Sequence, residues 1–196
     1  FDASAMLNPF VENRSLAGAV AAVVDKRGML SLDTVGYSDI AAGKRMKSDA
    51  VFWIASMSKP ITCTALMMLV DEKKLRVLDP VEKYLPEFKG QWLVAEQDAD
   101  YVLLKKPRHP ITVANVLSHT SGMPFSTPVE APTLDRLPLR TAIRSYAMTP
   151  LQFEPDTKYQ YSNCGTNTAG CIIEAVSGVP YEKFMQERLF EPLGMK

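Results

Sequence analysis

The chain has 196 residues, of which 46% are hydrophobic and 22% are charged, with 22 basic and 22 acidic side chains. This profile is typical of a folded globular protein and excludes intrinsic disorder as the main description. Because the charges balance, no basic surplus is left to bind phosphates, and we expect no nucleic-acid partner. The longest apolar run, residues 16–24, is about half of the ~18 residues that a membrane-spanning helix needs, so we expect no transmembrane segment.

Few side chains could bind a metal ion. The chain has three cysteines without a Cys-x-x-Cys pair, and only two histidines: Cys63, Cys164, Cys171, His109 and His119. An odd number of cysteines cannot all pair internally, and a zinc site would need a tighter cluster of ligands. We therefore predict free, mostly buried thiols and no metal site, and the chemistry that the motifs below indicate needs no cofactor.

The first quarter of the chain predicts a helix followed by a β-hairpin. Residues 2–11 carry a weak apolar stripe at helical spacing. Residues 18–24 and 29–36 are apolar runs joined by the turn signal of residues 25–28, which predicts two antiparallel strands. Residues 37–49 are polar and indicate a loop. Two strands cannot satisfy their own edges, so we expect another segment or chain to complete this sheet.

The rest of the chain is predicted to be mainly helical. Residues 60–75 are apolar over most of a helical circumference, which predicts a central helix with little exposed face. In residues 91–110 the apolar side chains recur at neither helical nor strand spacing, so we assign no helix or strand there. Thr112 is the expected N-cap of a helix that ends at Leu117. Further helices are predicted at residues 139–147, 166–176 and 181–189.

Ser56 and Lys59 form a Ser-x-x-Lys motif at the start of the apolar helix. Such a motif is weak alone, since about one chance match is expected in a chain of this composition. Pro60 strengthens the case for the motif, because proline fits comfortably in a helix only in its first turn. The helix is therefore expected to begin near Pro60, which places Ser56 at its N-terminus. There the helix dipole favours a developing anion, and Lys59 lies on the same face. The alternative is that Ser56 is only an N-cap and Lys59 a surface charge.

Tyr161 and Asn163 form a Tyr-x-Asn motif on an extended segment before a helix. About 0.2 chance matches are expected, so this motif is more specific. Residues two apart in an extended chain project from the same face, so both side chains would point into one cleft. The phenol could accept the serine proton if a nearby cation lowers its pKa. The alternative is that Tyr161 is a packing residue and Asn163 an N-cap.

Together, these motifs resemble the serine β-lactamase and penicillin-binding protein family, in particular its class C β-lactamase-like branch with related esterases and D-amino-acid peptidases. The resemblance is carried by five segments in the family's order, and it runs nearly from end to end of the chain: residues 52–60, 116–123, 153–163, 171–178 and 190–195.

The resemblance implies a role for each matching residue. Ser56 would be the acylated nucleophile, Lys59 its partner in deprotonation, Tyr161 the general base and later acid, and Asn163 a substrate-orienting residue. Whether Lys59 or Tyr161 takes the first proton is left open. His119 matches a family hallmark, and we assign it a structural role, because no carboxylate is seen to orient it.

The family's closing strand, with Lys-Thr-Gly or His-x-Gly, has no counterpart after Tyr161. The resemblance therefore implies an α+β, β-lactamase-like fold, an antiparallel sheet flanked by helices plus a helical subdomain, of which residues 1–196 are one incomplete N-terminal part. Residues 1–60 would supply the helix, hairpin and nucleophile turn, and residues 61–196 the mainly helical part. The location would be periplasmic or secreted if a signal peptide precedes Phe1, and cytoplasmic otherwise.

The function expected from this resemblance is a serine hydrolase that acts through an acyl-enzyme on an ester, a β-lactam or a D-amino-acid peptide. Its partners would be a small-molecule or peptide substrate and a C-terminal segment or second chain that completes the sheet. The alternative is a truncated or degenerate, non-catalytic homologue that binds peptidoglycan-like peptides or a partner chain. The sequence does not distinguish the three substrate classes, because fold does not determine substrate.

Overall fold

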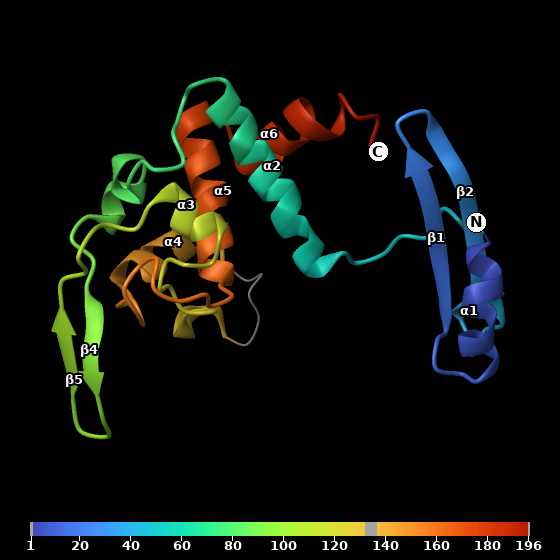
Figure 1. The fold of residues 1–196 in the computed structure, drawn as a ribbon, viewed down its shortest axis with the longest axis horizontal. Coiled ribbons are helices and arrows are strands. Elements are labelled where there is room, and N and C mark those ends of the chain that lie inside the picture. The colour runs from blue at the N-terminus through green and yellow to red at the C-terminus, as the bar shows by residue number, and fades with distance from the viewer. Residues whose placement is uncertain (1, 132–136, 196) are drawn as a thin grey trace. The chain divides into compact units, whose positions relative to one another are not determined.

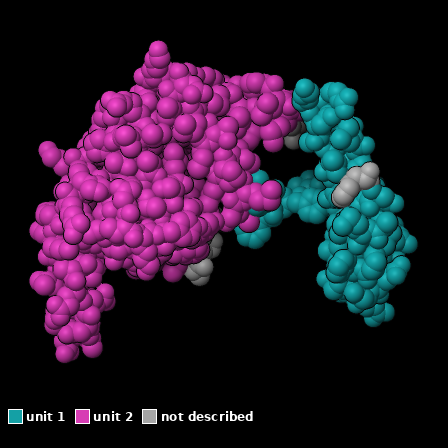
Figure 2. All heavy atoms as spheres, viewed as in Figure 1, with its two compact units in different colours: residues 1–54 teal, residues 55–196 magenta. Residues whose placement is uncertain are grey.

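The computed structural model describes residues 2–131 and 137–195. The chain separates into two compact units, residues 1–54 and 55–196, which we call unit 1 and unit 2 (Figure 2). The architecture is α+β with small antiparallel sheets, as predicted. The prediction of one incomplete domain stays a prediction.

Unit 1 contains helix α1 (Ala3–Glu12) and a three-stranded antiparallel sheet, β1 (Gly18–Asp25), β2 (Gly28–Asp39) and β3 (Lys44–Arg45) (Figure 1). Helix α1 packs against β2. The predicted helix and hairpin are confirmed, whereas the predicted loop over residues 37–49 is partly wrong. There β2 continues to Asp39 and pairs with the short strand β3.

The hairpin turn is closed by Asp25, whose Oδ1 accepts the backbone N–H groups of Arg27 at 2.7 Å and of Gly28 at 3.2 Å. At the far end of the strands Gly36 has φ +69°, and a Cβ there would lie 2.3 Å from the Ala17 carbonyl oxygen, so only glycine fits. Several apolar side chains of the hairpin are exposed, namely Val24, Met29, Leu30 and Leu32. The prediction that another segment completes this sheet stays a prediction.

Unit 2 is built around helices α2 (Ser58–Asp71) and α5 (Asn163–Ser177), which pack against each other. Helices α3 (Val113–Leu117), α4 (Leu139–Met148) and α6 (Tyr181–Met185) all pack on α5, and a π-helical turn, Gln186–Phe190, follows α6. Figure 1 shows α5 in orange among these helices. The core includes Leu66, Leu69, Val116, Ile143, Tyr146, Ile172 and Phe184.

The ends of α3 and α5 show defined caps, and Thr112 is the cap that the sequence predicted. Thr112 Oγ1 accepts the Asn115 N–H at 3.2 Å and caps α3, and Gly178 ends α5 in the left-handed conformation with φ +77°.

The central helix predicted over residues 60–75 was expected to have little exposed surface, and this expectation is wrong. Helix α2 buries one side through residues such as Leu66, whereas Met67 on the other side is exposed.

A second hairpin, β4 (Leu93–Gln97) and β5 (Val102–Lys105), lies within residues 91–110, where the sequence pattern predicted no helix or strand. It extends away from the helices of unit 2 (Figure 1, green). The side chains on both faces of β5 are exposed, so no alternation of apolar and polar residues marks the strand. Asp98 Oδ1 accepts the N–H groups of Asp100 and Tyr101 at 2.8 and 3.0 Å and closes the turn.

Within the described residues, no helix has both the length and the apolar character to cross a membrane. The three cysteines are free, as predicted, and two of them, Cys164 and Cys171, are buried.

Candidate active site

Ser56 lies in a 3-10 turn, Ala55–Met57, that runs directly into the N-terminus of α2. Pro60 is in the first turn of this helix, as predicted, where its missing N–H removes no hydrogen bond. Ala55 has φ +46°, a conformation that non-glycine residues adopt at a cost of about 1–2 kcal/mol. The fold therefore holds the exposed Ser56 hydroxyl on a sharp turn at the positive end of the helix dipole.

Lys59 follows Ser56 by three residues and contacts it directly. Its Nζ donates a hydrogen bond to Ser56 Oγ at 3.2 Å. The same Nζ lies 4.7 Å from the centre of the Tyr161 ring. The half-buried lysine therefore joins the serine of one motif to the tyrosine of the other, and the three side chains form a cluster within unit 2.

Tyr161 is half-buried and belongs to the extended segment that precedes α5. Lys59 and Ser56, which are placed to donate hydrogen bonds to its phenolic oxygen, lower the pKa of Tyr161, with Lys59 the larger cause and its charge adding to the effect. A lowered pKa makes the phenolate more accessible near neutral pH. Tyr161 thus has the nearby cation, Lys59, that it needs to act as a base.

Ser162 holds this segment in place and was missed by the sequence reasoning, which treated Asn163 as the candidate cap. The fully buried Ser162 Oγ accepts the Gly165 N–H at 3.0 Å and donates to the Pro124 carbonyl at 2.7 Å. Ser162 is therefore the N-cap of α5. Serine and asparagine are both favoured caps, so their order alone does not identify which one serves.

Asn163 is the first residue of α5, two residues beyond Tyr161. Its backbone N–H donates to the Phe125 carbonyl at 3.1 Å, which ties the helix start to the loop of residues 119–125. In the described part of the chain its carboxamide forms no hydrogen bond with Ser56, Lys59 or Tyr161. The structure brings Ser56, Lys59 and Tyr161 together, and Asn163 follows Tyr161 by two residues at the start of α5.

The loop of residues 119–125 lies against the Tyr161 segment. Gly122 has φ +81°, and a Cβ there would lie 2.3 Å from the Phe153 carbonyl oxygen, so only glycine permits this approach. The Phe125 ring stacks near Tyr161 with 6.2 Å between ring centres, and the His119 ring lies 4.7 Å from it. Sequence reasoning did not place these two aromatic rings at the site.

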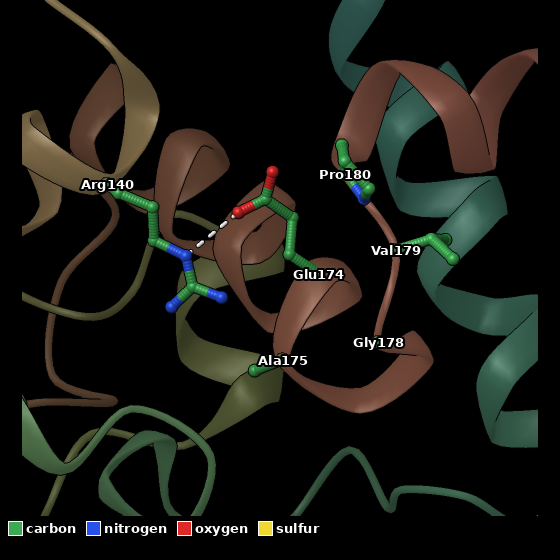
Figure 3. Close-up of a pocket in the computed structure, with 6 residues that line it drawn as sticks. All are labelled: Arg140, Glu174, Ala175, Gly178, Val179 and Pro180. Carbon is green, nitrogen blue, oxygen red and sulfur yellow. Dashed lines mark hydrogen bonds and ion pairs between the residues drawn. The ribbon is translucent and has the colours of Figure 1, made fainter.

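A surface pocket of about 360 Å³ lies at the other end of α5 and is lined by Arg140, Glu174, Ala175, Gly178, Val179 and Pro180 (Figure 3). Glu174 binds Arg140 Nε at 2.9 Å through one carboxylate oxygen and accepts the Tyr181 N–H at 3.0 Å through the other. Its carboxylate thus links α4, α5 and α6. We interpret this pocket as a structural junction that anchors α5, the helix that follows Tyr161.

Comparison with known proteins gives the family. The family model described as Beta-lactamase matches residues 3–196. The chain is 29% identical to the esterase EstB of Burkholderia gladioli, covering 98% of this chain and 49% of the esterase. It is 32% identical to the N-acetylmuramyl-L-alanine amidase of Bacillus subtilis, covering 91% of this chain and 41% of the amidase.

Among solved structures, EstCE1, a hydrolase with promiscuous acyltransferase activity, is 27% identical with a TM-score of 0.80. This match covers 98% of the present chain and 51% of EstCE1. The chain spans about half the length of the relatives it matches. The match of the family model to nearly the whole chain agrees with the resemblance seen in its motifs. The protein belongs to the Beta-lactamase family.

Proposed function

We propose that the protein is a serine hydrolase that forms an acyl-enzyme at Ser56. The observation that supports this most is the cluster of Ser56, Lys59 and Tyr161 at the N-terminus of α2, with Lys59 Nζ 3.2 Å from Ser56 Oγ. A nucleophilic hydroxyl beside two groups able to move its proton is the arrangement that covalent catalysis requires.

In the proposed acylation step, the Tyr161 phenolate takes the proton of Ser56 Oγ while that oxygen attacks the substrate carbonyl carbon. The carbonyl oxygen becomes an oxyanion, and the Ser56 backbone N–H at the helix N-terminus donates to it. The tetrahedral intermediate then collapses, the bond to the leaving group breaks, and Tyr161 returns its proton to the departing alcohol or amine.

Deacylation repeats the same proton movements with water. Tyr161 takes a proton from a water molecule, whose oxygen attacks the acyl carbon. Collapse of the second tetrahedral intermediate breaks the bond to Ser56 Oγ, which recovers its proton from Tyr161 and releases the acid. Asn163 is proposed to orient the substrate carbonyl or amide beside Ser56.

The choice of Tyr161 as the first base rests on its lowered pKa. Lys59 donates to Ser56 Oγ in the resting site, so its proposed role is to hold the hydroxyl and to stabilise the phenolate by charge. Tyr161 also returns the proton to the leaving group, so replacing it slows acylation whichever residue takes the first proton.

The substrate classes proposed are esters, D-amino-acid peptides and β-lactams. Relatives named as an esterase and an amidase support carboxylic ester and amide substrates in general. We propose a small-molecule or peptide substrate on the same grounds, and we propose no cofactor, because the steps above need only proton transfer and nucleophilic attack.

The test is to measure hydrolysis of a short p-nitrophenyl ester, nitrocefin and a D-Ala-D-Ala peptide side by side with the intact gene product. We expect activity on at least one, abolished by Ser56→Ala and lowered about 10²–10⁴-fold by Tyr161→Phe, the usual contribution of a general base. Tyr101→Phe, an exposed tyrosine in the β4–β5 turn, serves as the matched control. Activity that persists in Ser56→Ala, or binding of the peptide without turnover, would contradict the proposal.

A further inference from the structure

His119 contacts the backbone on both sides of Tyr161. Its carbonyl oxygen accepts the Gln160 N–H at 2.9 Å, and its Nδ1 accepts the Ser162 N–H at 3.2 Å. One residue thus binds the two amides that flank the phenol. The proposed mechanism assigns no role to this residue.

The imidazole also packs on the phenol itself. The ring centres of His119 and Tyr161 are 4.7 Å apart, with their planes tilted by 32°. The Tyr159 ring meets His119 edge-on, with 5.8 Å between centres at 85°. The Tyr161 ring is thereby fixed within reach of Lys59, whose Nζ lies 4.7 Å from its centre.

These contacts require a neutral imidazole. Since Nδ1 accepts a hydrogen bond from Ser162, the ring proton must be on Nε2. Burial and, secondarily, the charge of Lys59 lower the pKa of His119, which favours this neutral form. Among residues 2–131 and 137–195, the titratable groups that face the ring are Lys59 of α2 and the phenols Tyr159 and Tyr161. None of these three is a carboxylate that would stabilise imidazolium.

We propose that His119 is a positioning residue that, as neutral imidazole, holds the Tyr161 phenol against Lys59 and Ser56. This inference rests on the proposed function for its catalytic consequence, although the positioning itself is a property of the fold. The sequence analysis looked for a carboxylate partner of His119. The partner is instead a backbone amide on a distant segment.

Two substitutions of His119 test the hydrogen bond and the ring packing separately. His119 has φ +60°, a conformation that asparagine adopts more readily than most residues. In His119→Asn the amide oxygen occupies the place of Nδ1 and still accepts the Ser162 N–H. His119→Phe keeps an aromatic ring against Tyr161 but removes the acceptor. The two variants therefore separate the hydrogen bond from general packing.

The first measurement is the ionisation of Tyr161 in the intact gene product, followed by NMR of ¹³Cζ-labelled tyrosine. The Tyr161 signal is assigned by its loss in Tyr161→Phe. We expect the pKa of Tyr161 to rise in His119→Phe, because the phenol moves away from Lys59, and to stay lowered in His119→Asn. This readout does not depend on turnover, and circular dichroism of each variant shows whether it is folded.

The second measurement is the rate of labelling of Ser56 by a fluorophosphonate. We expect about a 100-fold loss in His119→Phe, the effect of displacing a catalytic group by about 1 Å, and rescue in His119→Asn. The other histidine, exposed His109, supplies the control His109→Asn, which should change neither readout.

The outcomes distinguish the two proposals. No labelling of the unchanged protein contradicts the proposed function, and the tyrosine titration then decides the positioning role by itself. A folded His119→Phe variant whose Tyr161 titrates as in the unchanged protein overturns the inference, whatever the activity. If His119→Phe does not fold, a raised pKa of Tyr161 in His119→Asn overturns it equally.

Discussion

Replacing Ser162 with alanine is expected to weaken unit 2 where α5 begins. Ser162 Oγ is fully buried and forms two hydrogen bonds, as acceptor from the Gly165 N–H at 3.0 Å and as donor to the Pro124 carbonyl at 2.7 Å. Loss of an N-cap costs about 1 kcal/mol. A buried carbonyl left without its donor costs about 1–3 kcal/mol more. We therefore predict that Ser162→Ala lowers the free energy of unfolding by about 2–4 kcal/mol.

The assay is urea denaturation of the intact gene product followed by circular dichroism. Ser118→Ala is a matched control, because Ser118 Oγ also donates to a backbone carbonyl, of Ala114 at 2.8 Å, but is exposed to water. Its loss should stay within about 0.5 kcal/mol. A loss below about 1 kcal/mol for Ser162→Ala, or equal losses for both variants, would refute the reasoning that this buried cap fixes the Tyr161 segment.

Three further predictions concern stability. Leu66→Ala, in the fully buried face of α2, should lower the free energy of unfolding by about 2–5 kcal/mol in the same assay, and a smaller loss would mean that α2 is not packed as described. Ala55→Gly should leave the free energy of unfolding unchanged or raise it by up to about 1 kcal/mol, because Ala55 has φ +46°, which glycine adopts without strain. Ala65→Gly, within α2, should instead lower the free energy of unfolding by about 1 kcal/mol or more. Lys83 and Tyr84, which hydrogen bond to Asp79, lower its pKa from 3.8 to about 2, so its carboxylate stabilises the fold above pH 3.8 and loses this effect as the pH falls through about 2. Asp79→Asn should therefore flatten the acid decline of thermal stability between these pH values, and an unchanged decline would contradict the assignment.

The sequence predicted the features that depend on local chemistry. Pro60 located the start of α2, because proline costs nothing where helix N–H groups lack partners. The three-residue spacing of Ser56 and Lys59 placed their side chains on one helical face, and the structure joins them at 3.2 Å. The sequence made a tyrosine base conditional on a cation near Tyr161, and the structure places Lys59 there, where it lowers the pKa of Tyr161.

Features that depend on distant or solvent-facing contacts could not be predicted in this way. The β4–β5 hairpin was missed because its strands are largely exposed and carry no alternating pattern. The partner of His119 is the backbone N–H of Ser162, and any residue at position 162 except proline would offer that donor. Likewise, the positive φ of Ala55 has no sign in its residue type.

The central claim, that Ser56 is acylated, is tested most directly by mass spectrometry. The intact gene product is incubated with a fluorophosphonate or a penicillin and digested, and the modified peptide is sequenced. We predict a single covalent adduct on Ser56 that is absent from Ser56→Ala and reduced in Lys59→Ala and Tyr161→Phe. An adduct on another residue, or one that survives Ser56→Ala, would contradict the account.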